Sequence, residues 1–224
     1  MIEDIIIAID GHSGCGKSTT SKFVAEYFNY KYLDSGAMYR AITLYLMRNE
    51  ISHNETDLIK DKLNDINITF HYVDGQQHTF LNNENVEKEI RGKKISNFVS
   101  KYSSISIIRE YLVSIQKEIG KGKKIVVEGR DITTIVFPDA EIKIFMTADI
   151  DVRAKRRFED MKKNNPDITY SDVLKNLTER DSKDSNRKDS PLRVADDAII
   201  IDTSSLEIDE QIKKIIDLIK NKFS

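Results

Sequence analysis

The segment Ile5–Thr19, with the sequence IIIAIDGHSGCGKST, constrains the fold of this chain more than any other stretch. Its first five residues are apolar, too few for a helix and too apolar for an exposed strand, so they predict a buried central strand of a parallel sheet. The next residues, Gly11 to Ser18, match the pattern G-x-x-x-x-G-K-[ST]. A helical pattern follows, in which Phe23, Val24, Tyr27 and Phe28 are expected to share one apolar face.

This combination of glycines, lysine and serine is typical of a loop that holds phosphate. Glycines let the backbone turn its N–H groups around a di- or triphosphate, and the positive end of the following helix faces the anion. Lys17 reaches the β- and γ-phosphates, and the Ser18 hydroxyl can coordinate Mg²⁺. We therefore predict a nucleoside triphosphate site formed by Gly11, His12, Ser13, Gly14, Cys15, Gly16, Lys17, Ser18 and Thr19. The alternative is a glycine-rich turn that binds nothing.

Length and charge limit the other classes of function. A chain of 224 residues suits one α/β domain with insertions. Lys and Arg number 35 against 37 Asp and Glu, so no overall field attracts nucleic acid or an anionic membrane. The single cysteine, Cys15, excludes an intrachain disulfide and a structural zinc cluster.

The sequence carries no targeting signal that we can identify. No apolar run approaches the ~18 residues of a membrane span, and the acidic start at residues 1–4 lacks the basic region of a signal peptide. We expect a soluble cytoplasmic protein.

Short apolar runs alternate with helical patterns along the rest of the chain. Further strands are expected at Tyr30–Leu33, Ile125–Val127, Ile142–Met146 and Ala198–Ile201. A strongly apolar helix is expected at Ala37–Met47 and a long helix with one buried stripe at Ser104–Ile119. A closing helix is expected to face inward with Ile208, Ile212, Ile215, Ile216 and Ile219. The predicted fold is an α/β phosphate-loop core with a doubly wound, five-stranded parallel sheet.

Two segments stand apart from that core within a single domain of residues 1–224. Residues 51–92 are more polar, and the alternation of Ile68, Phe70 and Tyr72, a turn at Asp74-Gly75 and a return at Thr79–Leu81 predict a small β-containing insertion. The second segment comprises residues 151–187 and is expected to be helical on both sides of Pro166. The insertion could grip an acceptor molecule or simply cover the core.

Polar residues follow two of the predicted strands. Asp34, Ser35 and Arg40 come after the second strand, and Glu128, Arg130 and Asp131 come after the run ending at Val127. Because the carboxyl ends of parallel strands face the ligand crevice, these residues are site candidates.

Arginines recur at helical spacing in the later segment. Arg153, Arg156 and Arg157 stack on one face, and Arg180, Asp184 and Arg187 would share another if that segment is helical. Both sets could be solvated surface charge of little energetic value. A phosphate-loop protein, however, needs cations for a transferring phosphoryl group.

The motifs favour a phosphoryl transferase over a nucleotide-driven switch. A GTPase would need an Asn-Lys-x-Asp motif and an Asp-x-x-Gly motif, and neither occurs. Arginines scattered over strand ends and a late helix instead suit a second anionic substrate opposite ATP.

From Ile5 to about Leu218 the chain resembles the bacterial cytidylate kinases, a family of nucleoside monophosphate kinases. The similarity rests on GHSGCGKST at 11–19, YLDSGAMYR at 32–40, EGRDITTIVFPDA at 128–140, RAKRR at 153–157 and ERDSKDSNR at 179–187. The resemblance implies an enzyme that phosphorylates CMP and dCMP with ATP and Mg²⁺. Together with the balanced charge, we expect a monomer without nucleic acid or membrane partners.

The resemblance also implies residue roles. The acceptor phosphate would be held by Arg40, Arg130 and Arg187, and cytosine would be recognised by Ser100, Arg109 and Asp131. The sugar would be contacted by Ser35, Arg180 and Asp184. A lid over 151–187 would bring Arg153 and Arg157 to the transferring phosphates. Glu128 stands where relatives commonly carry aspartate, so its link to Mg²⁺ through water stays open. Two alternatives also remain: a kinase for UMP or another small anionic acceptor, and a nucleotide-binding regulatory module.

Overall fold

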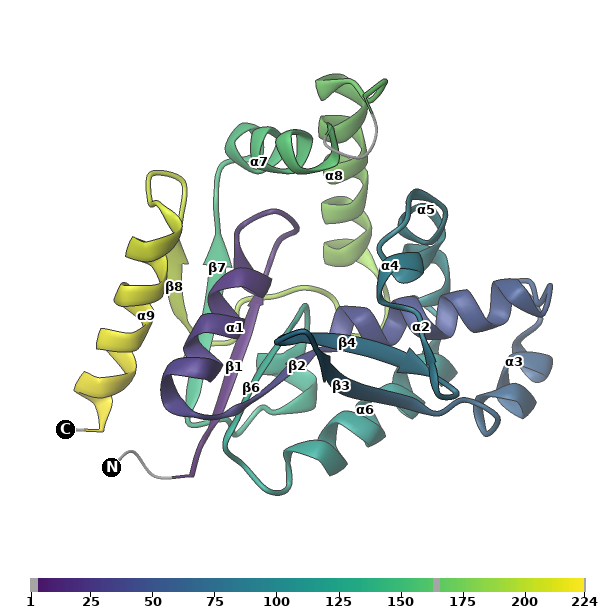
Figure 1. Ribbon diagram of the computed structural model, residues 1–224, viewed down its shortest axis with the longest axis horizontal. Helices are drawn as coiled ribbons and strands as arrows, with labels where there is room; N and C mark the ends of the chain where they lie inside the picture. Colours follow the sequence, from purple (N-terminus) through teal and green to yellow (C-terminus); the bar gives the residue numbers. More distant parts are fainter. Residues whose placement is uncertain (1–3, 163–165, 224) are drawn as a thin grey trace. The chain divides into compact units, whose positions relative to one another are not determined.

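Five parallel strands form the main sheet of the computed structural model, which describes residues 4–162 and 166–223. The strands are β1 (Ile6–Gly11), β2 (Lys31–Asp34), β6 (Ile125–Gly129), β7 (Ile142–Thr147) and β8 (Ile199–Asp202). Their order is β2-β6-β1-β7-β8, so the predicted first strand is central (Figure 1). Its neighbours cover it on both edges, because Ala8 pairs with Val127 of β6 and with Lys143 of β7. The doubly wound sheet expected from the sequence is confirmed.

The chain divides into two units, the first made of 1–33 and 119–224 and the second of 34–118. Besides the sheet, the first unit holds α1 (Lys17–Phe28), the short π-helix η1 (Ile132–Val136), α7 (Ile150–Lys162), α8 (Tyr170–Asn186) and α9 (Ile208–Lys222). Helices α1 and α9 pack against each other beside the sheet (Figure 1). Their buried side chains, such as Val24 and Ile215, join Ile7 and Ile144 of the strands in one apolar core.

The inward face of α1 agrees with the prediction for Val24 and Phe28, which join the core, and differs from it for Phe23 and Tyr27. Val24 is fully buried, but Phe23 and Tyr27 are 50% and 52% exposed. The other buried side chains of the helix include those of the small residues Thr20, Ser21 and Ala25. Aromatic residues at i and i+4 share one face of a helix, but their spacing does not show whether that face is buried. In α1 the face that carries Phe23 and Tyr27 is exposed.

Helices α7 and α8 form a pair of their own in the first unit. Ala154, Val173 and Leu177 are buried between them. Helix α8 begins with a capping box, in which the Thr169 side chain accepts from the Asp172 N–H and the Asp172 carboxylate accepts from Thr169. Residues 163–165 of the expected lid, and 1–3 of the acidic start, lie outside the described residues.

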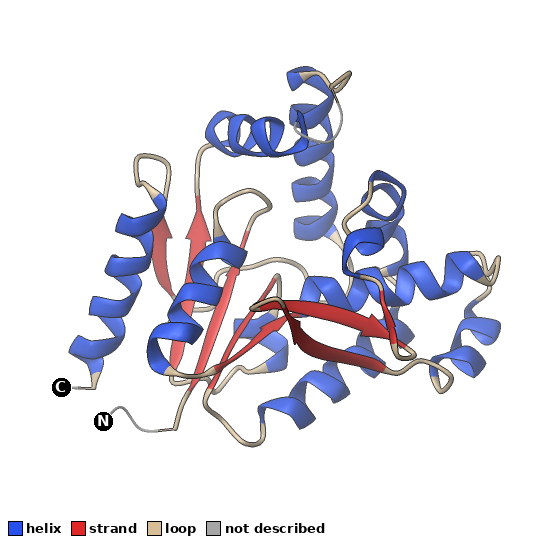
Figure 2. Ribbon diagram, in the orientation of Figure 1, coloured by secondary structure: helices blue, strands red, loops and turns tan. Residues whose placement is uncertain are grey.

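The second unit combines helices with a small antiparallel sheet. It contains α2 (Ser35–Arg48), α3 (Thr56–Leu63), α4 (Glu87–Ile90), α5 (Lys93–Tyr102) and most of α6 (Ser106–Gly120). Its sheet has the order β3 (Ile68–Val73), β4 (Gln76–Leu81) and β5 (Glu84–Asn85), drawn in red in Figure 2. The hairpin agrees with the predicted alternation, and its turn places Asp74 and Gly75 at positive φ. Helix α2 packs on α5 and β4, and its buried side chains include Met38 and Ile42.

A search of the described helices finds none with both the length and the apolar character needed to span a bilayer.

Candidate active site

The predicted phosphate loop connects β1 with α1 and depends on glycine at three places. Gly11, Gly14 and Gly16 have positive φ angles of 147°, 83° and 90°. A Cβ on Gly11 would lie 1.9 Å from the Met146 carbonyl oxygen, so no other residue fits there. The loop leads straight into the first turn of α1, whose unpaired N–H groups and dipole favour an anion.

Lys17 lies back across this loop. Its Nζ donates to the His12 carbonyl oxygen at 2.6 Å and lies 3.7 Å from the Cys15 sulfur. The side chain is buried, and burial together with the nearby charge of Arg130 lowers the pKa of Lys17. The ammonium group is therefore held beside the loop without a carboxylate partner among the contacts of the described chain.

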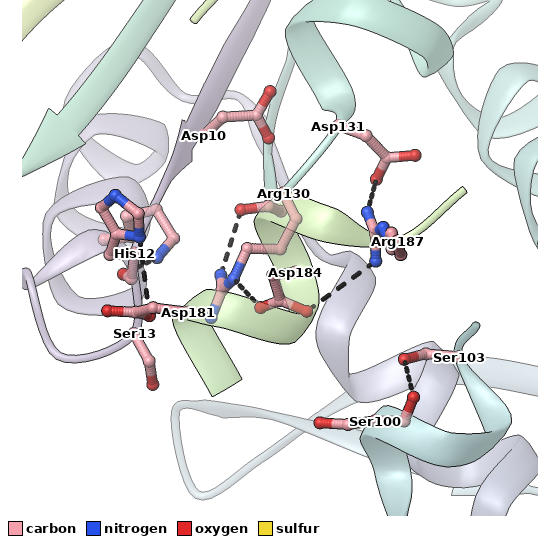
Figure 3. Close-up of polar contacts among 12 residues, drawn as sticks. Asp10, His12, Ser13, Ser100, Ser103, Arg130, Asp131, Asp181, Asp184 and Arg187 are labelled. Atoms are coloured by element: carbon pink, nitrogen blue, oxygen red, sulfur yellow. Dashed lines mark hydrogen bonds and ion pairs between the residues drawn. The ribbon is translucent and has the colours of Figure 1, made fainter. Parts of the chain in front are cut away.

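Arg153 of α7 ties the loop to the lid helices. Its Nε donates to the Ala148 carbonyl, and its Nη1 contacts the Ser13 carbonyl at 3.3 Å and an Asp181 carboxylate oxygen at 2.5 Å. The other Asp181 oxygen lies 3.5 Å from His12 Nδ1 (Figure 3). Asp181 of α8 thus contacts His12 of the phosphate loop and also Arg153, which touches the same loop. The guanidinium of Arg153 is therefore already engaged in contacts within the protein.

Arg157, one turn further along α7, is different. Within the described residues it has no hydrogen-bond or ion-pair partner. Burial and the charge of Arg130 lower the pKa of Arg157, and the charge of Asp160 opposes this shift only in part. A partly buried guanidinium that forms no ion pair within the described part of the chain is suited to an anionic ligand.

Arg130 and Arg187 share one carboxylate. Arg130 Nε lies 3.1 Å from an Asp184 oxygen, and Arg187 Nη1 lies 3.9 Å from the other (Figure 3). Burial opposes the charge of Arg130, but Asp184 outweighs it and the pKa of Arg130 is raised. Arg187 continues the chain of charges to Asp131, 3.8 Å away. Arg187 follows the last residue of α8 and accordingly leaves the helix, so the predicted common helical face holds only for Arg180 and Asp184.

In the second unit, Asp34 forms ion pairs with two arginines at the start of α2. Its carboxylate accepts the Ala37 N–H, which caps the helix, and lies 3.1 Å from Arg40 and 2.8 Å from Arg91. Burial would raise the pKa of Asp34, but the two guanidinium groups lower it to about 2. Ser35, the next residue, is buried.

Arg109 of α6 is buried in the same unit. It donates to the Ser103 carbonyl at 2.9 Å, and its guanidinium stacks 5.2 Å from the centre of the Tyr39 ring. Ser100 lies in the last part of α5, and its carbonyl accepts from the Ser103 hydroxyl.

The first unit therefore brings together the loop, Lys17, Arg130, Asp131, Arg153, Arg157, Asp184 and Arg187, whereas Ser35, Arg40, Ser100 and Arg109 belong to the second.

Sequence reasoning did not single out Asp181, which sits inside the ERDSKDSNR motif. It also omitted Asp10, a carboxylate in an otherwise apolar strand next to the loop. The change of character within that strand was the signal that could have revealed Asp10. Glu128, at the end of β6, is buried and accepts the Tyr32 hydroxyl.

A phosphate loop after the central strand of a parallel sheet, with buried cations beside it, defines a phosphotransferase of the phosphate-loop kinase class. Shikimate kinase from Bacteroides thetaiotaomicron shares the fold, with a TM-score of 0.51 at 13% identity over 96% of this chain and 98% of that one. Residues 7–221 match the cytidylate kinase family model, and the chain belongs to that family. A cytidylate kinase of Flavobacterium psychrophilum is 49% identical, covering 98% of this chain and 100% of the relative. One from Bacteroides fragilis is 47% identical over 94% of each.

Proposed function

We propose that this chain transfers the γ-phosphoryl group of ATP to the phosphate of CMP and dCMP. The observation that carries the proposal is the gathering of cations in the first unit. The charge of Arg130 acts on both Lys17 and Arg157, and Arg157 has no partner within the described residues. Such a cluster is costly to hold together unless anions bind there, and a kinase binds phosphates on both substrates.

The donor triphosphate would occupy the loop of residues 11–19. Lys17 would exchange the His12 carbonyl for phosphate oxygens, a better partner for an ammonium group. The Ser18 hydroxyl is exposed, and in the described chain no residue hydrogen-bonds to it, so it fits a ligand of Mg²⁺. Mg²⁺ typically keeps several waters and needs few protein ligands, which suits one hydroxyl with Glu128 behind a water. When bound with ATP, it would neutralise charge on the phosphates.

The acceptor phosphate would lie on the guanidinium groups of Arg130 and Arg187. Both now face Asp184, and guanidinium forks match phosphate oxygens well. The family resemblance adds Arg40 to the phosphate, Asp131, Arg109 and Ser100 to cytosine, and Ser35, Arg180 and Asp184 to the sugar. A carboxylate can accept from the cytosine N4 amine, whereas uracil presents an oxygen at that position.

The chemistry needs no general base. The acceptor phosphate has a second pKa of about 6, so at neutral pH it already offers an attacking oxyanion. Lys17 and Arg157 would stabilise charge on the transferring group, and closing of the α7–α8 pair would exclude water that otherwise hydrolyses ATP.

An acceptor panel tests the proposal. ADP release is measured with ATP, Mg²⁺ and CMP, dCMP, UMP or AMP, and we expect activity with the two cytidine nucleotides. Preference for UMP or AMP would remove the cytosine assignment. Tight ATP binding with no acceptor-dependent ADP release would instead indicate a regulatory module. Light scattering checks the expected monomer.

A further inference from the structure

Asp10 is a buried carboxylate that the proposed mechanism does not use. It is the penultimate residue of β1, directly before Gly11 of the phosphate loop, and its exposed fraction is 0%. One oxygen accepts the Ile132 N–H at 2.9 Å. The other accepts the Thr133 N–H at 2.7 Å and the Thr133 hydroxyl at 2.6 Å.

These three hydrogen bonds fix a turn that carries two predicted substrate residues. The backbone of Asp10 is paired in register with Gly129, at the end of β6. Arg130 and Asp131 follow, and the π-helix η1 begins at Ile132 with N–H groups that no residue of that helix can satisfy. The turn is therefore held at Gly129 by the sheet and at Ile132 and Thr133 by the Asp10 side chain.

Burial disfavours the ionised form of Asp10. Burial raises the pKa of Asp10 to about 6, despite the hydrogen bonds from Thr133 and Ile132 that lower it. At pH 7 the folded protein keeps this carboxylate ionised against the cost of burial. A group held at such a cost beside two candidate site residues suggests a role in arranging them.

We infer that Asp10 is a positioning residue, which holds the Arg130–Asp131 turn in the conformation that binds the acceptor nucleotide. The inference rests on the proposed function, because it concerns the acceptor of that reaction. It also predicts which substrate is affected. The Asp10 side chain hydrogen-bonds to the turn, whereas within the described residues it acts on Lys17 of the phosphate loop through its charge alone. A change of side chain should therefore act more strongly on CMP than on ATP.

Two adjacent threonines allow a matched test. The Thr133 hydroxyl donates to Asp10, whereas the Thr134 hydroxyl is buried with no hydrogen-bond partner among the described residues. Replacing either by valine keeps the side-chain shape and removes one hydroxyl. Asp10→Asn replaces an acceptor by an amide donor that faces N–H groups.

The experiment measures KM for CMP and for ATP, with the melting temperature of each variant. In Asp10→Asn we expect KM for CMP to rise about tenfold or more, from the loss of charge-assisted hydrogen bonds, with KM for ATP changed less than about threefold. Thr133→Val should raise KM for CMP by a smaller factor, about two to five, and Thr134→Val should leave both constants unchanged. Equal rises in the two KM values, no change in either, or the same effect from both threonine variants would overturn the inference. If the unaltered protein fails to phosphorylate CMP, the proposed function fails instead, and calorimetric titration of CMP into the same variants then tests the positioning role alone.

Discussion

Arg153 and Asp181 form an ion pair, with 2.5 Å between Nη1 and Oδ2. The same guanidinium donates to the carbonyls of Ala148 and Ser13, so Arg153 joins α7, α8 and the phosphate loop. Arg157 lies four residues later on the same helix and has no such partner within the described residues. The two lid arginines, equivalent by sequence motif, therefore differ in what they can offer a substrate.

Arg157→Gln should lower kcat without lowering stability. Removing one cation that stabilises the transferring phosphoryl group is expected to reduce kcat by about 10²–10³-fold. The melting temperature should stay within about 2 °C of the original, because a poorly compensated charge is lost. Steady-state kinetics and calorimetry measure the two quantities.

Arg153→Gln should instead lower the melting temperature by several degrees. The change removes the guanidinium that the Asp181 carboxylate and the Ser13 carbonyl contact, and breaking a buried pair typically costs about 3–5 kcal/mol. Lys155→Gln, an exposed change on the same helix, serves as control for both variants. Equal losses of melting temperature in the Arg153 and Arg157 variants would contradict the division of roles.

Lys17→Ala should abolish phosphoryl transfer whichever acceptor is right. The lysine supplies the ammonium group beside the loop, and its present contacts, the His12 carbonyl oxygen and the Cys15 sulfur, are not cations that could replace it. We expect kcat at the detection limit and an intact fold by circular dichroism. Lys213→Ala, on the exposed side of α9, should remain active. Retained transfer in the Lys17 variant would place the triphosphate elsewhere.

The sequence predicted the sheet because each of its strands is a short apolar run next to a helical pattern. It predicted the loop because only glycine tolerates the backbone angles found at Gly11, Gly14 and Gly16. The buried face of α1 was not predictable, since Phe23 and Tyr27 differ from Val24 in exposure rather than in polarity.

The spacing of residues in the sequence also could not predict which residues pair with the charged side chains. Asp181 meets Arg153 across 28 positions of sequence, and Asp10 meets Thr133 across 123. Local periodicity carries no information on such pairs, because they depend on how strands and helices are ordered in space. Resemblance named Arg153, but only its contacts separate its role from that of Arg157.

The acid stability of the protein should depend on Asp34. Its pKa is about 2 in the folded state against an ordinary 3.8, so the ionised form favours folding. This contribution is complete above about pH 4 and is lost as the pH falls toward 2; linkage sets it at about 2 kcal/mol, roughly half of it gone at pH 3. Asp34→Asn keeps a good helix cap but removes the titration, so its free energy of unfolding should fall less between pH 6 and 3.

Urea unfolding at several pH values measures this difference. Asp65→Asn is the matched control, because Asp65 is exposed and its ion pair with Lys62 is worth little. A pH profile of Asp34→Asn parallel to that of the unaltered protein would show that Arg40 and Arg91 do not stabilise the Asp34 carboxylate.

Asp131→Ala should reduce discrimination between CMP and UMP more than it reduces ATP affinity. The Asp131 carboxylate is buried and lies 3.8 Å from Arg187, and in the proposed role it accepts from the cytosine amine. A lost contact of this kind is worth about 1–3 kcal/mol, so the ratio of kcat/KM for CMP over UMP should fall about 10- to 100-fold. KM for ATP, measured in the same assays, should change little, because Asp131 is not a residue of the phosphate loop.

Asp139→Ala removes an exposed carboxylate after the same strand and should leave the ratio intact. An unchanged ratio in Asp131→Ala would remove this residue from the base site and transfer cytosine recognition to Arg109 and Ser100.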